Sequence, residues 1–287
     1  MFLNNVKTWI LIFGLVFLMT ALGGALGNQQ GAVIGFAMAA VMSLYSYWFS
    51  DKMVIKAYHG QQVSAQNHPR LYGIVQTLAR RADLPMPKVY IVPEDQPNAF
   101  ATGRNPEHAA VACTKGLLRL MNDEELSGVL GHELGHIKHR DILISTIAAT
   151  CAGAISNISR FLNVGSNNAR QRRDGNTLLM VIATPLIAMI MQMAISRKRE
   201  YMADRAGAEF SGNPLYLRDA LAKLETYSRQ IPLQNMQNPT TAHMFIIYPF
   251  AGSGGLQSLF RTHPATADRI RELEKMAQAQ RMIHTDL

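Results

Sequence analysis

The chain opens with two long runs of residues that carry no charge, separated by a short polar turn. The runs cover residues 8–27 and 31–50, and Asn28-Gln29-Gln30 lies between them. Each has about the 20 residues that cross a hydrocarbon core as a helix. The second run follows at once, with no clear small-residue cleavage site before a mature domain. The pattern therefore predicts an uncleaved helical hairpin rather than a signal peptide.

A second apolar pair lies in the middle of the chain, at residues 142–158 and 178–195. Cations that flank a membrane span mark its cytoplasmic side. They flank these runs at Lys7, Lys52, Lys56 and 197–199, which predicts cytoplasmic ends for both pairs. Arginines also lie in the link within the second pair, at positions 160, 170, 172 and 173. The second pair is therefore either two full spans or a shallow re-entrant hairpin.

The remaining segments carry the patterns of short helices and strands. Apolar residues at helical spacing follow Asn67-His68-Pro69, and Asn122 with Glu125 three residues later has the pattern of a capping box before another helix. Apolar stretches bounded by turn residues predict strands at residues 88–92, 98–102 and 109–114. Further helices are predicted at residues 196–210 and 215–229 and from Thr262-His263-Pro264 onward.

These elements predict a fold of the α+β class, mainly helical, with a small sheet and two hydrophobic membrane hairpins. The first hairpin takes residues 1–50 and the second takes residues 141–195. A single mixed domain is divided between residues 51–140 and 196–287, on either side of the second hairpin.

The composition also favours a membrane protein. Charged residues make up 17% of the 287 and apolar residues 48%, and the net charge is +8. A basic balance fits nucleic acid or an anionic membrane surface. The cations are scattered and no nucleic-acid motif accompanies them, so we expect no nucleic-acid partner. Cys113 and Cys151 form no C-x-x-C pair, which predicts small buried side chains and a reducing compartment.

Candidate chemistry lies at residues 132–136, which read HELGH. Positions i and i+4 of a helix share one face, so His132 and His136 can present their imidazoles to one metal ion. Zinc suits imidazole and carboxylate ligands. Glu133 lies about 100° further round the helix, where its carboxylate can take the proton of an attacking water. The alternative is a polar surface helix, because charged residues follow directly.

Glu200 is the candidate for the third protein ligand that a catalytic zinc requires. Asp204 lies four residues later on the same helical face, where it would accept a hydrogen bond from a ligating histidine. HELGH and Glu200 flank the second hairpin, so a hairpin that enters and returns brings them to one side of the membrane. In the alternative, Glu200 pairs with Arg197 or Lys198 on a solvated helix face.

In these motifs the chain resembles the HtpX-type membrane metalloproteases, bacterial relatives of the eukaryotic CAAX prenyl proteases. The resemblance covers nearly the whole chain and includes both hydrophobic pairs. It rests on NAFATG at 98–103, HELGH at 132–136, REYMAD at 199–204 and THPATADRI at 262–270. One departure is the link within the second pair, which is rich in Arg and Asn rather than acidic.

The resemblance implies a multi-pass protein of the bacterial inner membrane, with a zincin-like metalloendopeptidase domain in the cytoplasm. It implies Zn2+, one per chain, bound by His132, His136 and Glu200, with Glu133 as general base. The implied role is stress-related quality control, in which the partners are the lipid bilayer and unfolded or misfolded membrane proteins as substrates.

Two further segments acquire roles by this analogy. An edge strand beside the cleft would pair with an extended substrate by backbone hydrogen bonds, using Asn98, Ala99, Phe100 and Ala101. The alternative is an ordinary surface strand. His263 would donate a proton or stabilise the oxyanion, and the alternative there is a helix-capping histidine.

Other functions are less well supported by the residues. A protease that cuts within the bilayer would carry its H-E-x-x-H motif inside an apolar span, whereas charged residues surround this one. A prenyl-protein processing protease of narrow specificity and a non-catalytic membrane scaffold stay as alternatives. The glycine-rich segment at 252–255 is a candidate lid. The sequence makes no prediction about the oligomeric state.

Overall fold

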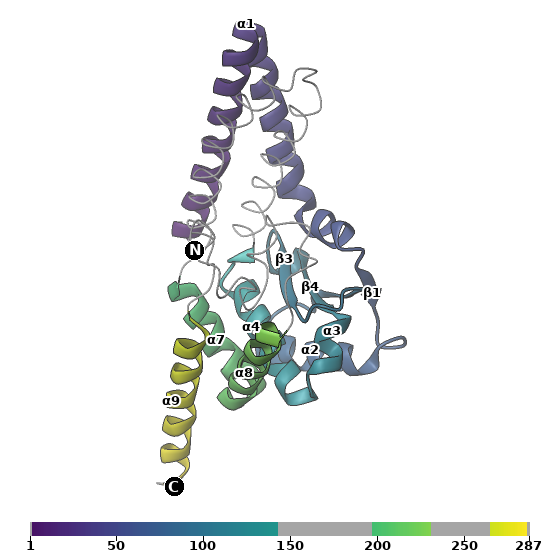
Figure 1. Cartoon of the computed structure of the whole chain (residues 1–287), viewed down its shortest axis with the longest axis vertical. Helices are drawn as coiled ribbons and strands as arrows, with labels where there is room; N and C mark the ends of the chain where they lie inside the picture. Colours follow the sequence, from purple (N-terminus) through teal and green to yellow (C-terminus); the bar gives the residue numbers. More distant parts are fainter. Residues whose placement is uncertain (1, 143–196, 231–264, 286–287) are drawn as a thin grey trace.

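The computed structural model describes residues 2–142, 197–230 and 265–285. The second apolar pair (apart from Ile142), the glycine-rich segment at 252–255, Cys151 and His263 lie outside these residues. Figure 1 shows a long helical hairpin at one end of the molecule and a mixed domain at the other.

The hairpin is formed by α1 (Phe2–Ala57), which breaks at Gly27 and Asn28, where Asn28 has a φ of 54°. This break lies beside the polar turn expected from the sequence, and the two arms run side by side in opposite directions (Figure 1). In the described part of the chain, Gly27–Phe49 is the one helical segment long and apolar enough to cross a membrane. The other arm contains the shorter apolar helix Ile12–Ala21.

A four-stranded sheet forms one side of the mixed domain, with the strand order β1-β2-β4-β3. Its strands are β1 (Gln61–Val63), β2 (Lys88–Val92), β3 (Ala99–Gly103) and β4 (Ala109–Thr114). β2 and β4 are parallel, whereas the outer strands are antiparallel to their neighbours. The three predicted strands are confirmed, with β3 displaced by one residue. The short and mostly exposed β1 has no apolar pattern and was not predicted.

The helices of the domain agree with the expected pattern. They are α2 (Pro69–Arg81), α3 (Lys115–Leu120), α4 (Asp123–Lys138), α7 (Arg197–Ser211), α8 (Pro214–Gln230) and α9 (Thr266–Thr285). The capping box that opens α4 is confirmed: the Asn122 side chain accepts a hydrogen bond from the Glu125 N–H, at 2.8 Å, and Glu125 accepts one from the Asn122 N–H, at 3.0 Å. The short α3 was not predicted.

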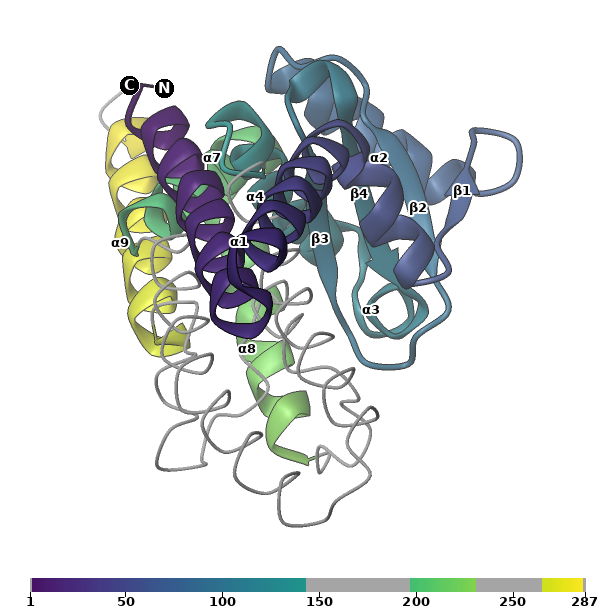
Figure 2. The same cartoon turned by 90° about the horizontal axis from the view of Figure 1, so that it is seen from above.

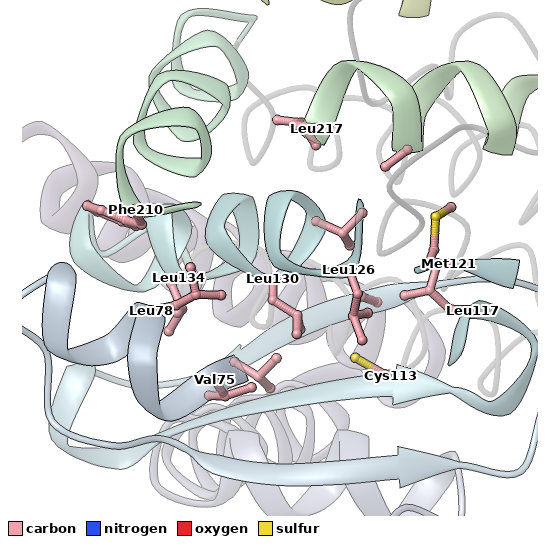
Figure 3. Close-up of a cluster of buried hydrophobic side chains, with 14 of the residues drawn as sticks. Val75, Leu78, Cys113, Leu117, Met121, Leu126, Leu130, Leu134, Phe210 and Leu217 are labelled. Atoms are coloured by element: carbon pink, nitrogen blue, oxygen red, sulfur yellow. The ribbon is translucent and has the colours of Figure 1, made fainter. Parts of the chain in front are cut away.

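The central element is α4, which lies between the sheet with α2 on one side and α7 with α8 on the other (Figures 2 and 3). Leu126, Leu130 and Leu134 of α4 are fully buried in the main core. Each fully buried leucine contributes about 1.5–3 kcal/mol, so this face fixes α4 against the sheet. The opposite face of the sheet is covered by the end of α1, where Tyr58 contacts Phe100 of β3.

Small residues let α7 approach α4 closely. A side chain built on Gly131 would place its Cβ 3.0 Å from the carbonyl oxygen of Gly207, and one on Gly135 would lie 3.0 Å from Cα of Ala203. Larger residues would hold the two backbones apart. The contact brings the first turn of α7, which carries Glu200, alongside the two histidines of α4.

Candidate metal centre and active site

Three side chains from two helices converge at the end of α4. Nε2 of His132 and Nε2 of His136 lie 3.2 Å apart. A Glu200 oxygen lies 3.5 Å from Nε2 of His136, and the other lies 3.6 Å from Nε2 of His132. Donors placed 2.0–2.1 Å from one tetrahedral zinc ion are about 3.3–3.4 Å apart. The three side chains therefore fit a zinc ion in both chemistry and spacing.

Asp204 and Arg269 lie behind His132. An Asp204 oxygen is 2.9 Å from Nδ1 of His132. Arg269, on α9, donates two hydrogen bonds to the same carboxylate, at 2.6 and 2.9 Å, and its side chain is only 1% exposed. Because Nδ1 faces a carboxylate, it carries the proton and leaves the Nε2 lone pair free for a metal.

A similar but longer arrangement lies behind His136. Asp141, just beyond the end of α4, places an oxygen 3.5 Å from Nδ1 of His136. The other oxygen of Asp141 lies 3.6 Å from Nη1 of Arg199, in the first turn of α7. Nδ1 of each histidine thus faces a carboxylate, and an arginine contacts that carboxylate.

Burial and mutual pairing shift the pKa values of His132 and Asp204. Burial lowers the pKa of His132 to about 4, although the hydrogen bond to Asp204 acts in the opposite direction. Burial alone would raise the pKa of Asp204, but Arg269 and His132 hold it at about 2. Asp204 is therefore ionised and His132 is neutral at neutral pH, as a ligating imidazole must be.

The carboxylates around His136 have the opposite effect on its imidazole. Burial would lower the pKa of His136, but Glu200, Asp141 and Glu133 raise it to about 9. Burial raises the pKa of Glu133 to about 7, against the opposing effects of His136 and of a backbone hydrogen bond from Ala101. A divalent cation between the ligand atoms would repel the added proton on His136 and so favour its neutral form.

The hydrogen bond between Glu133 and Ala101 connects the candidate base to the free edge of the sheet. Among the residues that the structure describes, β3 is the outer strand and pairs only with β4. Asn98 and Thr114 exchange two hydrogen bonds across that pair, from Asn98 N–H to Thr114 Oγ1 and from Thr114 N–H to Asn98 O, both at 2.9 Å. Antiparallel pairing alternates, so the backbone of Phe100 also faces β4, whereas Ala99 and Ala101 face the open edge.

The structure therefore brings together His132, Glu133, His136, Glu200 and Asp204, as the sequence predicted. Of the four residues predicted to bind substrate, Ala99 and Ala101 present backbone groups to the open edge, whereas Asn98 and Phe100 direct theirs to β4. The predicted position His263 lies outside the described residues. Three supporting residues were missed by the sequence reasoning: Asp141, Arg199 and Arg269.

A signal for Arg269 does exist in the sequence. Arg269, Leu273 and Ala277 are spaced four residues apart on α9, and all three are buried. A cation at a position of an apolar helical stripe requires a buried acidic partner, and Asp204 is that partner. Asp141 gave no comparable signal, because it follows the motif within a run of charged residues.

Comparisons with known proteins agree with this geometry. The model of Peptidase family M48 matches residues 65–277. The chain is 50% identical to a "Protease HtpX homolog" of Methylibium petroleiphilum over 95% of this chain and 98% of the relative. It is 51% identical to another from Campylobacter curvus over 94% and 96% of the two chains, and 49% identical to one from Burkholderia ambifaria over 97% and 99%.

Among solved structures, the chain is similar to S. mikatae Ste24p, with a TM-score of 0.52 and 18% identity. The match covers 95% of this chain and 66% of that one, and it shows a shared, mainly helical fold with a small sheet. Membership of the M48 family implies a metal, usually zinc, which the cluster of His132, His136 and Glu200 fits. The chain therefore belongs to Peptidase family M48 and is a metalloprotease of the HtpX type.

Proposed function

We propose that this chain is a membrane-integrated zinc endopeptidase that cleaves unfolded or damaged segments of membrane proteins. The observation that carries the proposal is the position of Glu133. Its carboxylate lies between the cluster of His132, His136 and Glu200 and the open edge of β3, where it accepts the Ala101 N–H. A peptide bond held at that edge would lie beside both the base and the metal ligands.

The residues of the chain have separate roles in this proposal. When zinc is bound, it supplies a Lewis acid that polarises the scissile carbonyl and acidifies water. Glu133 takes the proton of the attacking water on a carboxylate oxygen and passes it to the leaving amine. Asp204 and Asp141 hold the two imidazoles in the orientation and tautomer that a metal requires.

Substrate binding is proposed to use the backbone of β3. The open edge carries the N–H and C=O groups of Ala99 and the C=O group of Ala101, whose N–H is donated to Glu133, and an extended peptide can add to such an edge as a further strand. Backbone pairing requires an extended conformation rather than a particular sequence. This selectivity suits the removal of misfolded membrane proteins, which expose unfolded segments of many sequences.

The membrane placement is part of the same proposal. The segment Gly27–Phe49 is long and apolar enough to span, and exposed aromatic side chains lie near its end, at Tyr45 and Trp48. We propose that the second apolar pair also enters the bilayer, and that Lys7, Lys52 and 197–199 keep the catalytic domain on the cytoplasmic side of a bacterial inner membrane.

The proposal is tested with wild type and Glu133→Gln, purified in detergent and loaded with zinc. Glu209→Gln serves as the matched control, because it makes the same chemical change on an exposed carboxylate of α7. Cleavage of casein and of an unfolded membrane protein is followed alongside zinc content. We expect wild type and Glu209→Gln to cut, and Glu133→Gln to bind one zinc but lose at least about a hundredfold in rate.

Retained cleavage by Glu133→Gln would remove Glu133 as the base. Zinc binding without cleavage in all three proteins would favour a scaffold or a processing protease of narrow specificity. Cleavage of the soluble substrate alone would keep the protease and reject the proposed substrate class.

A further inference from the structure

A cavity of about 920 Å3 lies between the first halves of α7 and α9, on the side away from the sheet. We call it the α7–α9 cavity; it is lined by Arg197, Lys198, Tyr201, Met202, Asp204, Arg205, Asp268, Arg271, Glu272, Leu273, Lys275 and Met276. Its volume is typical of sites that bind small molecules. Apart from Asp204, which supports His132, no lining residue has a role in the proposed reaction or in substrate pairing at β3.

The lining of the α7–α9 cavity has an excess of cations. Five of its side chains are basic and three are acidic. Arg271 and Lys275 are already paired, with Asp268 and Glu272 one turn away on the same helix. The acid deepest in the site, Asp204, is paired with Arg269. Each acidic side chain of the cavity is thus paired with a basic side chain of the protein.

Three cations of α7 stay without an acidic partner in the part of the chain that the structure describes: Arg197, Lys198 and Arg205. Lys198 and Arg205 are seven residues apart, so they lie on one face of the helix. Between them on that face, Tyr201 and the exposed Met202 provide apolar surface. The cavity therefore offers positive charge beside an apolar strip, which matches an anionic amphipathic ligand.

The position of α7 identifies the source of such a ligand. Arg197 lies two residues after the end of an uncharged apolar segment, residues 178–195, which we propose enters the bilayer. In Figure 1, α7 begins just below the N-terminal end of α1, at the base of the hairpin. Cations at that level meet the headgroup layer of the cytoplasmic leaflet.

We propose that the α7–α9 cavity binds the phosphodiester headgroup of an anionic phospholipid, with Lys198 and Arg205 on the phosphate and Tyr201 and Met202 against the glycerol and the first acyl carbons. This inference rests on the proposed membrane integration. The bound headgroup fills the cavity between α7 and α9, the two helices that carry Asp204 and Arg269. It therefore stabilises the contact that supports His132.

The test uses the full-length protein, freed of lipid in detergent and titrated with short-chain phosphatidylglycerol. Short-chain phosphatidylcholine and inorganic phosphate are titrated separately, to distinguish an anionic lipid from a neutral one and from a free phosphate. The variant is Lys198→Gln/Arg205→Gln. The control is Arg80→Gln/Lys115→Gln, which removes the same charge from exposed positions of α2 and α3. Casein cleavage by the same preparations reports separately on the proposed function.

We expect saturable binding of phosphatidylglycerol, with a rise in melting temperature, in wild type and in the control. The variant should bind about thirtyfold more weakly, because each Lys or Arg at an anionic lipid surface contributes about a factor of five. Equal binding by variant and control, binding of phosphatidylcholine as tight as that of phosphatidylglycerol, or no binding at all would overturn the proposal. Inorganic phosphate that binds as tightly as the lipid would also overturn it, in favour of a free phosphate.

Discussion

Asp204 lies 2.9 Å from Nδ1 of His132, whereas Asp141 lies 3.5 Å from Nδ1 of His136. In both arrangements a carboxylate lies between an imidazole and an arginine, but the distances between these groups are shorter on the His132 side. Arg269 makes two short hydrogen bonds to Asp204, whereas the contact between Arg199 and Asp141 is an ion pair at 3.6 Å. His132 is also almost fully buried, whereas the side chain of His136 is 16% exposed.

The difference shows which histidine depends on the tertiary fold. The support of His132 joins α4, α7 and α9, whose residues are far apart in the sequence. The support of His136 begins only five residues after it, at Asp141. We therefore infer that the His132 side fixes the helices around the metal site, and that the His136 side, which is partly solvated, tolerates change better.

The largest effect is expected from Arg269→Met. The substitution leaves the buried Asp204 carboxylate without its cation, and breaking a buried ion pair in this way costs about 3–5 kcal/mol. The free energy of unfolding in detergent, measured by denaturant titration, should fall by that amount. The control is Arg269→Met/Asp204→Leu, which removes both charges and should recover most of the stability. A single variant as stable as wild type would contradict the inferred role of this pair.

A smaller effect, on zinc affinity, is expected from Asp204→Asn, which keeps the shape of the side chain but weakens the hydrogen bond to His132 and removes the charge that pairs with Arg269. Loss of a carboxylate behind a ligating histidine typically lowers metal affinity by about 10–100-fold. The zinc dissociation constant, measured by competition with a chromogenic chelator, should rise within this range. Unchanged affinity would show that Asp204 does not orient His132.

Asp141→Asn sharpens the comparison, because it makes the same change behind the other histidine. The longer contact and the partial exposure of His136 predict that zinc affinity falls by less than about tenfold. The zinc dissociation constant of this variant is measured by the same chelator competition. A loss equal to or greater than that of Asp204→Asn would reverse our inference about the two sides.

The smallest effect is expected from Lys223→Met, a substitution on α8 beside the end of α4 that is remote from the metal ligands. Lys223 donates to Glu125 at 2.6 Å, and the Lys223 side chain is 39% exposed, whereas that of Glu125 is 9% exposed. Because water reaches one partner and the Asn122 N–H still donates to the Glu125 carboxylate, we expect the pair to contribute about 0–1 kcal/mol. Stability should change within that range, and zinc affinity should not change. Weaker zinc binding in this variant would mean that any loss of charge in contact with α4 disturbs the site.

Local spacing explains why much of the site could be predicted from the sequence. His132 and His136, and likewise Glu200 and Asp204, are separated by one helical turn, so each pair shares a face wherever the helix packs. The polar turn between the first two apolar runs and the capping box at Asn122 are local features in the same sense.

The parts that were missed depend on contacts between distant segments. Arg269 and Asp204 are 65 residues apart in the sequence, and their hydrogen bonds depend on how α9 packs against α7. The hydrogen bond from Ala101 to Glu133 depends on which edge of β3 stays open, and this follows from the order of the strands. The short β1 forms only because β2 lies beside it, since its own three residues carry no pattern.

The most direct test of the central claim is X-ray absorption at the zinc edge, on purified protein loaded with one equivalent of zinc. We expect nitrogen and oxygen ligands only, with two imidazoles in wild type. In Glu200→Ala we expect the same two imidazoles, one carboxylate fewer and weaker binding. A sulfur ligand, a third imidazole, or a spectrum and affinity unchanged by Glu200→Ala would contradict the assignment of His132, His136 and Glu200 as the metal site.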